Sequence, residues 1–372
     1  MVVSFRTYKK CSPNGKVTIY VGKREIVDTV SAVEPIDGLI ALDPEYIQSN
    51  RKIYAQLICY FRYGREDDET MGLNFYKEFI LESNQLYTQG KTDVMLTKWQ
   101  SCLLEKLGHN AFPFTLKMSP NCPVSVVLQQ KASDKSQPLG VQYFIKVFVG
   151  DSETDRSHRR STVNLGIRKV QYAPINQGIQ PCTVVRKGFL LSPDELELEM
   201  NLDQQIYHPG DKIAVNISIR NKSSRCVRKI QAKVMQTVQF RIFQTGQMRH
   251  MINSIETTEG CPVGPGASLQ KVIYLQPNLV FTQNRFGVAI EGHLKRRETN
   301  LASTTLISTA DNKDVFGITV SYSIKVKLFM GCLGGELSAE LPFVLMHPKP
   351  NRQLISSHEK YEGIAEKNSD YE

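Results

Sequence analysis

Clusters of basic side chains are the clearest chemical feature of this sequence. They are Lys9-Lys10, Lys23-Arg24, Arg156-Ser157-His158-Arg159-Arg160 and Lys295-Arg296-Arg297. Arginine binds two phosphate oxygens through its planar fork and lysine supplies a point charge, so the clusters together could recognise phosphate. Any one cluster taken alone is more simply a solvated basic surface.

The charge balance of the whole chain points to an acidic partner. A net charge of +9 at pH 7 and a pI near 9.0 favour binding to nucleic acid, anionic lipid or phosphorylated protein. Nucleic acid is disfavoured, because no aromatic residues alternate with the basic ones and no recognition helix is visible.

Catalytic and metal-binding motifs are absent from the sequence. There is no GxSxG, Walker or HExxH motif, and Gly331-Cys332-Leu333-Gly334-Gly335 lacks the dinucleotide-binding spacing. The eight cysteines and seven histidines do not cluster, so we expect buried free thiols and no metal site. We therefore expect a binding protein that is not an enzyme and needs no cofactor.

Apolar residues that alternate with polar ones indicate strands of half-buried sheets. The alternating sets begin at Val17, Ile53, Tyr143, Ile213 and Ile318. The turn at 207–211 leads into the fourth set, as in immunoglobulin-like sandwiches. The fold class predicted is all-β, with β-sandwich domains.

One segment has helical rather than strand periodicity. The apolar positions Trp99, Leu103 and Leu107 recur at helical spacing, Thr97 and Gln100 fit a capping box, and Gly108 suits the C-terminal cap. We predict one short amphipathic helix in the N-terminal domain. Its apolar stripe is either local core or a switchable docking surface, and local core is the simpler interpretation.

The length of 372 residues predicts two domains. The segment 173–181 is rich in Pro, Gly, Asn and Gln, which is typical of a linker. We place the N-terminal domain at 1–172, a hinge linker at 173–184, the C-terminal domain at 185–346 and a polar tail at 347–372. The chain lacks a secretory signal and an apolar run long enough to cross a bilayer, so we expect a cytoplasmic protein.

The segment from Phe61 to Phe75 is a long, charged connection between two strand patterns, with an apolar tip at Met71-Gly72-Leu73. An exposed loop is the plain interpretation. Loops on rigid sandwiches also carry recognition, and an apolar tip on a charged loop suits insertion into a crevice.

The sequence resembles the arrestins over about residues 2–350, and most of all the invertebrate photoreceptor arrestins. The matching motifs are Phe61-Arg62-Tyr63-Gly64-Arg65-Glu66-Asp67-Asp68-Glu69 with Met71-Gly72-Leu73, Gly22-Lys23-Arg24-Glu25, Leu103-Leu104-Glu105-Lys106-Leu107-Gly108, Gly166-Ile167-Arg168-Lys169-Val170-Gln171, Asn300-Leu301-Ala302-Ser303-Thr304-Thr305 and Leu345-Met346-His347-Pro348. The first motif departs from the family at Thr70, where an aliphatic residue is usual.

The resemblance implies the arrestin fold of two immunoglobulin-like β-sandwiches and a protein that terminates signalling by an activated, phosphorylated G-protein-coupled receptor, rhodopsin being the expected one. A finger loop would enter the receptor crevice, and residues at family basic positions would bind phosphate. The finger-loop residues are Tyr63, Gly64, Arg65, Glu66, Asp67, Asp68, Glu69, Met71, Gly72 and Leu73. The phosphate-binding residues are Lys9, Lys10, Arg24, Arg159, Arg160 and Lys295.

The resemblance also implies a polar core in which Arg168 is buried among Glu25, Glu291 and Glu298. An incoming phosphate could compete for Arg168 and so switch the protein to a receptor-binding state. Relatives often carry Asp where this chain has the three glutamates.

The tail after Pro350 departs from the family. It contains no phenylalanine and a single arginine, Arg352, so we do not expect the family's usual C-terminal latch. It also lacks a clear clathrin-binding box. Two alternatives stay open: an adaptor for receptor internalisation, and a scaffold that binds inositol phosphates or anionic phospholipid through Lys222, Arg225, Arg228 and Lys229.

Overall fold

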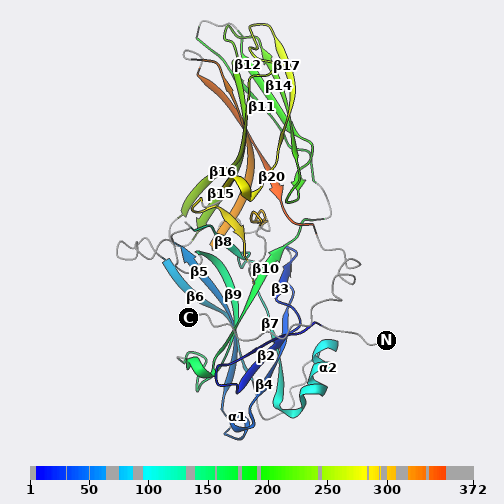
Figure 1. The fold of residues 1–372 in the computed structure, drawn as a ribbon, viewed down its shortest axis with the longest axis vertical. Coiled ribbons are helices and arrows are strands. Elements are labelled where there is room, and N and C mark those ends of the chain that lie inside the picture. Colours follow the sequence, from blue (N-terminus) through cyan, green and yellow to red (C-terminus); the bar gives the residue numbers. More distant parts are fainter. Residues whose placement is uncertain are drawn as a thin grey trace.

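The computed structural model is built mostly of strands, arranged as two lobes placed end to end along the longest axis (Figure 1). The first lobe contains β1 to β10 and the second contains β11 to β17, β19 and β20. The structure describes residues 6–30, 32–49, 51–63, 75–86, 95–130, 139–155, 157–174, 178–190, 194–241, 245–282, 285–292, 294, 300–306, 317–331 and 335–348.

The first lobe packs a four-stranded antiparallel sheet against a larger one. The smaller sheet has the order β1 (Tyr8–Cys11), β2 (Val17–Val21), β4 (Ile36–Leu42), β7 (Ala111–Leu116). The alternation predicted from Val17 is confirmed, since Val17, Ile19 and Val21 are fully buried.

The larger sheet crosses the boundary between the lobes. Its order is β18 (Ala289–Glu291), β8 (Val126–Leu128), β9 (Leu139–Val149), β10 (Val163–Gln171), β3 (Glu25–Asp28), and β5 (Ile53–Tyr63) joins β9 and carries β6 (Phe75–Leu86). Strand β18 follows all the strands of the first lobe in sequence, so the second part of the chain completes a sheet of the first lobe. The pair β10–β3 is parallel.

Strand β5 differs from the half-buried strand that its alternation predicts. Tyr54, Gln56 and Ile58, on the face opposite the core, are 5%, 1% and 2% exposed. The segment after β9 covers this face, because the Gln56 side chain donates to the carbonyl of Glu153 at 2.8 Å. Sequence alternation could not reveal a cover supplied by a distant segment.

The second lobe is a sandwich of two sheets. One has the order β11 (Cys182–Lys187), β12 (Leu196–Leu202), β14 (Ile213–Asn221), β17 (Ser268–Leu275). The other has the order β13 (Ile206–Tyr207), β20 (Glu336–Leu345), β19 (Gly317–Phe329), β15 (Lys229–Arg241), β16 (Thr245–Thr257). Alternate residues of β12, β14 and β15 are buried, as expected for strands with one core-facing side.

The predicted helix is α2 (Lys98–Leu107), and its Thr97–Gln100 capping box and Gly108 cap are present. A second short helix, α1 (Pro44–Gln48), was not predicted; Asp43 caps it and Pro44 begins it. Three 3₁₀ turns complete the described elements: η2 (Gly108–Asn110), η3 (Arg159–Ser161) and η4 (Leu279–Thr282). None of the described helices is long and apolar enough to cross a membrane.

The cysteines are free thiols in the described part of the chain, but most are not buried. Cys59 is buried, whereas Cys11, Cys102 and Cys182 are exposed and Cys122, Cys226 and Cys261 are partly buried. The expectation of buried thiols was wrong for these positions, because several occupy an edge strand or the outer side of α2. Cys332 lies outside the described residues.

Candidate functional site

Arg168 lies on β10 at the boundary between the lobes. The parallel pairing of β10 with β3 places Arg168 opposite Glu25, and Nη2 of Arg168 lies 2.6 Å from Oε1 of Glu25. The Arg168 side chain is 24% exposed and the Glu25 side chain 47% exposed. Solvent, and a dissolved anion, can therefore reach this ion pair.

The Arg168 guanidinium also contacts the second part of the chain. Its Nη1 donates to the carbonyl of Gly292 at 3.1 Å, just after β18. Its Nε is buried and has no hydrogen-bond partner among the described residues. One side chain thus joins β3 and β10 to the segment after β18, and one of its donors is unused.

The other predicted acidic partners of Arg168 do not pair with it in the described part of the structure. Oε1 of Glu291 lies 2.7 Å from Nε2 of His347 instead, and Glu298 lies outside the described residues. His347 follows β20, and its carbonyl accepts the amide of Ala173, so backbone bonding brings its ring to the end of β18. Among the residues that the structure describes, the predicted polar core therefore consists of Arg168 with Glu25.

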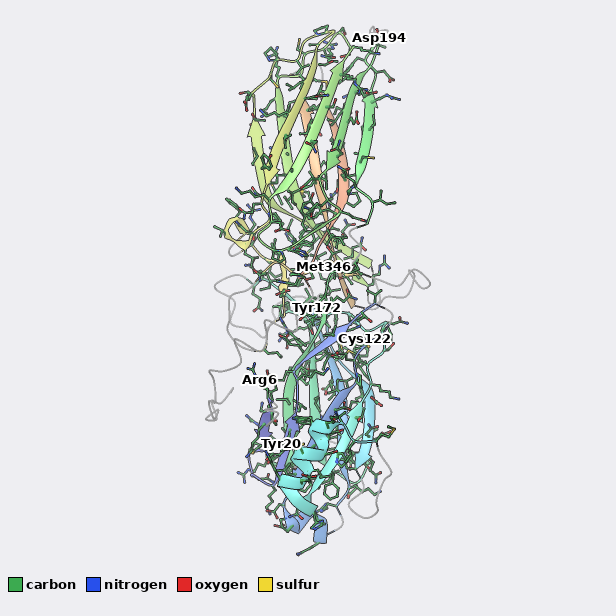
Figure 2. The ribbon with its side chains drawn as sticks, turned by 90° about the vertical axis from the view of Figure 1, so that its right-hand side faces the viewer. Arg6, Tyr20, Cys122, Tyr172, Asp194 and Met346 are labelled. Atoms are coloured by element: carbon green, nitrogen blue, oxygen red, sulfur yellow. The ribbon has the colours of Figure 1, made fainter. Side chains whose placement is uncertain are left out.

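Arg168 and Glu291 nevertheless line one pocket of about 360 Å³ between the lobes. Tyr172, Ser303 and His347 also line it. Figure 2 shows Tyr172 and Met346 at this junction. Burial, and then the negative charge of Glu25, raise the pKa of Tyr172, so its hydroxyl stays neutral here.

The predicted phosphate-binding residues come from three neighbouring elements at one edge of the first lobe. Lys9 and Lys10 are exposed on edge strand β1, and Nζ of Lys9 lies 5.7 Å from the centre of the Tyr20 ring. Arg24, between β2 and β3, donates through Nε to the carbonyl of Gly166 at 2.7 Å. This bond fixes Arg24 on β10, two residues before Arg168.

Arg159 and Arg160 are exposed in η3. The amide of Asn14, in the turn after β1, donates to the carbonyl of Arg160 at 3.0 Å. The turn that follows the two lysines therefore packs against η3. Lys295 lies outside the described residues.

The predicted finger loop connects β5 to β6. These strands pair antiparallel up to Tyr63 and Phe75, so the connection joins the two arms of a hairpin. The loop residues Gly64, Arg65, Glu66, Asp67, Asp68, Glu69, Met71, Gly72 and Leu73, and the side chain of Tyr63, lie outside the described residues.

The predicted helix stripe packs less deeply than a core stripe. Trp99, Leu103 and Leu107 are only partly buried, and the one fully buried residue of α2 is Gln100. Its Nε2 donates to the carbonyls of Gly38 and Phe114 at 3.1 and 3.3 Å. A polar anchor thus holds α2 on its sheet, and the apolar stripe keeps some exposure.

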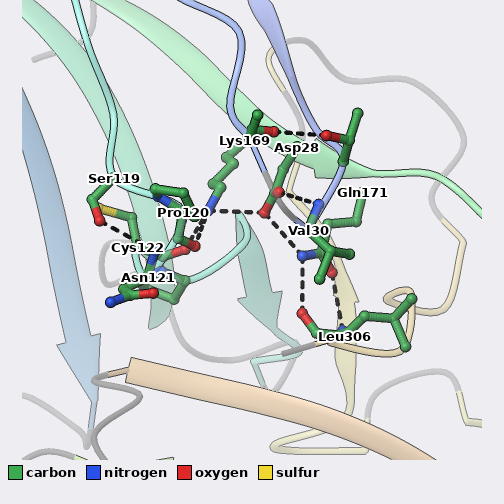
Figure 3. Close-up of polar contacts among 12 residues, drawn as sticks. Asp28, Val30, Ser119, Pro120, Asn121, Cys122, Lys169, Gln171 and Leu306 are labelled. Carbon is green, nitrogen blue, oxygen red and sulfur yellow. Dashed lines mark hydrogen bonds and ion pairs between the residues drawn. The ribbon is translucent and has the colours of Figure 1, made fainter. Parts of the chain in front are cut away.

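Sequence reasoning missed a second polar network on β10. Nζ of Lys169 lies 2.9 Å from Oδ2 of Asp28, and these side chains are 0% and 1% exposed (Figure 3). Gln171 donates to the same carboxylate at 2.9 Å. The signal was available, because Lys169 and Gln171 continue the alternation of Val163, Leu165 and Ile167 on the core-facing side.

Comparison with known proteins gives consistent matches along the chain. Residues 17–173 match the family described as "Arrestin (or S-antigen), N-terminal domain", and residues 192–350 match the corresponding C-terminal domain. The chain is 63% identical to Phosrestin-2 of Drosophila melanogaster over 353 residues, which covers 95% of this chain and 97% of that protein.

Two further relatives extend the comparison to other arthropods. An arrestin homolog of Heliothis virescens is 56% identical, with 95% of this chain and 92% of that protein covered. The lateral eye arrestin of Limulus polyphemus is 42% identical, with 96% and 88% covered. The chain belongs to the arrestin family and carries its N-terminal and C-terminal domains in that order.

Proposed function

We propose that this arrestin binds an activated, phosphorylated G-protein-coupled receptor at the membrane and ends its signalling to G protein without catalysing a reaction. The observation that supports this most is the ion pair of Arg168 with Glu25, which is open to solvent and lies beside a bond to Gly292. The names of its relatives, among them a lateral eye arrestin, favour a light receptor such as rhodopsin.

The proposed mechanism is competition for the Arg168 guanidinium. A receptor phosphate carries about −1.5 to −2 charges and offers three acceptor oxygens, so it can replace the single Glu25 contact with a bidentate one. The buried Nε of Arg168, which has no partner among the described residues, becomes a further donor for the phosphate once the side chain turns outward. When Arg168 turns to the phosphate, its bond to the Gly292 carbonyl is lost and the two lobes are less tightly restrained.

The basic residues at the edge of the first lobe would guide the phosphorylated segment to Arg168. Lys9, Lys10 and Arg160 lie on elements that contact one another, and Arg24 bonds to β10 close to Arg168. The hairpin between β5 and β6 would supply the second input by entering the crevice of the active receptor. Requiring both inputs makes binding specific for a receptor that is active and phosphorylated.

The charge reversal Arg168→Glu tests this function. It places two carboxylates side by side and breaks the Gly292 bond, so we expect binding to active, unphosphorylated receptor to approach the level seen with phosphorylated receptor. Arg186→Glu is the matched control, because Arg186 forms a 2.7 Å ion pair with Glu197 on the second lobe. Retained dependence on phosphate in Arg168→Glu, measured by co-sedimentation with receptor membranes, would contradict the proposal.

A second candidate function is binding of an inositol phosphate or anionic phospholipid by the second lobe. The turn after β14 favours it, because Asn221 donates to the carbonyl of Val263 and accepts from Ser223, which fixes a turn that carries Lys222 and Arg225. Sedimentation with phosphoinositide vesicles in the absence of receptor tests this function, and a Lys222→Gln variant should bind them less. An adaptor role in internalisation would instead require co-sedimentation with clathrin.

A further inference from the structure

The core-facing network of β10 is fully paired. The Lys169 ammonium donates to Asp28 and to the carbonyls of Pro120 and Cys122, and the other Asp28 oxygen accepts the amide of Val30 at 2.7 Å (Figure 3). Val30 has a φ of 71°, a strained conformation for a β-branched residue. Asp28 therefore pairs with a buried charge and also accepts the amide of a strained turn at this end of β3.

Gln171 connects this buried network to the second lobe. Its Nε2 donates to the carbonyl of Leu306 at 3.0 Å, and its Oε1 accepts the amide of Leu306 at 3.0 Å. The side-chain amide thus pairs with the backbone as a neighbouring strand would. The segment of Leu306 is bound to the second lobe, since the Thr305 amide donates to the carbonyl of Val320 at 2.9 Å.

Two residues of β10 therefore hold the two ends of one segment of the second domain. Arg168 holds Gly292 through a side chain that is 24% exposed, and Gln171 holds Leu306 and is 8% exposed. Side chains alternate between the two faces of β10, so Arg168 lies on the more exposed face and Gln171 on the buried face. Both side chains line the pocket between the lobes, but the first contact is the more accessible of the two to an anion.

We propose that Gln171 is a pivot of the switch: its paired bonds to Leu306 persist when Arg168 releases Gly292, and together with the pairing of β18 with β8 they let the second lobe turn at the boundary rather than separate. Gln171 is a positioning residue with no contact to the receptor phosphate in this scheme. The inference rests on the proposed release of Arg168, but its test does not need the receptor.

The test is residue-resolved hydrogen exchange of the Leu306 amide, which the Gln171 side chain protects directly. In Gln171→Met this amide loses a buried partner, and we expect its exchange to be about tenfold faster or more. In Arg168→Glu, where the Gly292 contact is broken by design, we expect exchange at Leu306 to stay within about twofold of the original protein. The Thr305 amide, bonded within the second lobe, is the internal reference.

Gln56→Met is the matched control variant. Gln56 is a buried glutamine of the same lobe that binds the carbonyl of Glu153, so its loss removes a similar bond away from the boundary. Exchange at Leu306 should not change in it. Should Gln171→Met not fold, Gln171→Asn shortens the side chain by one methylene and serves the same purpose.

Two results would overturn the pivot. One is acceleration of Leu306 exchange in Arg168→Glu to the level of Gln171→Met, which would mean that both contacts open together as one lock. The other is unchanged exchange in Gln171→Met. Because neither result depends on receptor binding, an Arg168→Glu variant that still requires phosphate would refute the proposed function and leave the pivot to be judged by exchange alone.

Discussion

Strand β10 carries two polar networks whose residues are neighbours in sequence but differ in access to solvent. On one face, Arg168 pairs with Glu25, and both side chains are partly exposed. On the other face, Lys169 pairs with Asp28, and both are buried. The first pair can exchange its carboxylate for another anion at low cost, because water screens the intermediate states. The second cannot, because an unpaired charge would be left in a medium of low dielectric.

The difference separates two tasks that one ion pair could not perform together. A sensor must open when a ligand arrives, whereas a structural contact must stay closed while the sensor opens. The alternation of side chains along β10 separates the two tasks: Arg168 lies on the accessible face, and Lys169 and Gln171 lie on the core face. Substitutions on the two faces test whether they differ as much as their exposure indicates.

The largest effect is expected for Lys169→Met. It leaves the Asp28 carboxylate buried without its ammonium partner, which should lower the free energy of unfolding by roughly 3–5 kcal/mol. Arg168→Met leaves a Glu25 that water can solvate and should lower it by about 1 kcal/mol or less. Urea denaturation followed by circular dichroism measures both, and equal losses would show that the two faces are equivalent.

A double replacement sharpens this comparison. Adding Asp28→Asn to Lys169→Met removes the unpaired carboxylate, and the amide oxygen can still accept the Val30 amide. We expect the double variant to be more stable than Lys169→Met alone by about 1–2 kcal/mol. Additive losses in the same urea experiment would mean that Asp28 acts mainly through the turn and not through its charge.

Removal of charge at the accessible edge should affect binding rather than folding. The double variant Lys9→Gln and Lys10→Gln is expected to bind a doubly phosphorylated peptide about tenfold more weakly, which is about 1.4 kcal/mol. Lys212→Gln with Lys233→Gln removes the same charge from the second lobe and is the control. Isothermal titration calorimetry would contradict the assignment if both double variants lost affinity equally.

The smallest effect is a pH dependence from His250 on β16. Burial lowers the pKa of this imidazole, so the folded state favours its neutral form. The contribution of neutral His250 to stability is therefore present above the pKa of about 6.5 that the imidazole has in the unfolded state. It is lost as the pH falls through the lower pKa of the folded state. We expect the Tm to fall less between pH 7.5 and 5.5 in His250→Leu than in the original protein. His109→Gln, at an exposed position, should not alter the slope.

Periodicity predicted the strands that pack on their own lobe. The sets beginning at Val17, Ile213 and Ile318 became β2, β14 and β19, and the apolar residues of each set are buried. The capping box of α2 was equally readable, since it depends only on residues three positions apart. Local patterns were sufficient wherever the deciding contacts were local.

Contacts between distant segments could not be predicted in this way. Three residues of β18 carry too little pattern to reveal that they pair with β8 in the other lobe. The same holds for the site: the resemblance to arrestins suggested Arg168 and Glu25, and the parallel register of β10 with β3 brings them together. The pairing of Glu291 with His347 depends on the path of the chain after β20, which no sequence pattern encodes.

Strand β18 has a consequence for any attempt to study the first lobe alone. A fragment that stops at residue 172 lacks β18, so the backbone groups of Val126–Leu128 on that side of β8 lose their partners. Gln129 loses its bonds to Val288 and Gly287 as well. Such an open edge pairs readily with another copy of itself, so the fragment should self-associate unless a peptide spanning residues 285–292 is supplied.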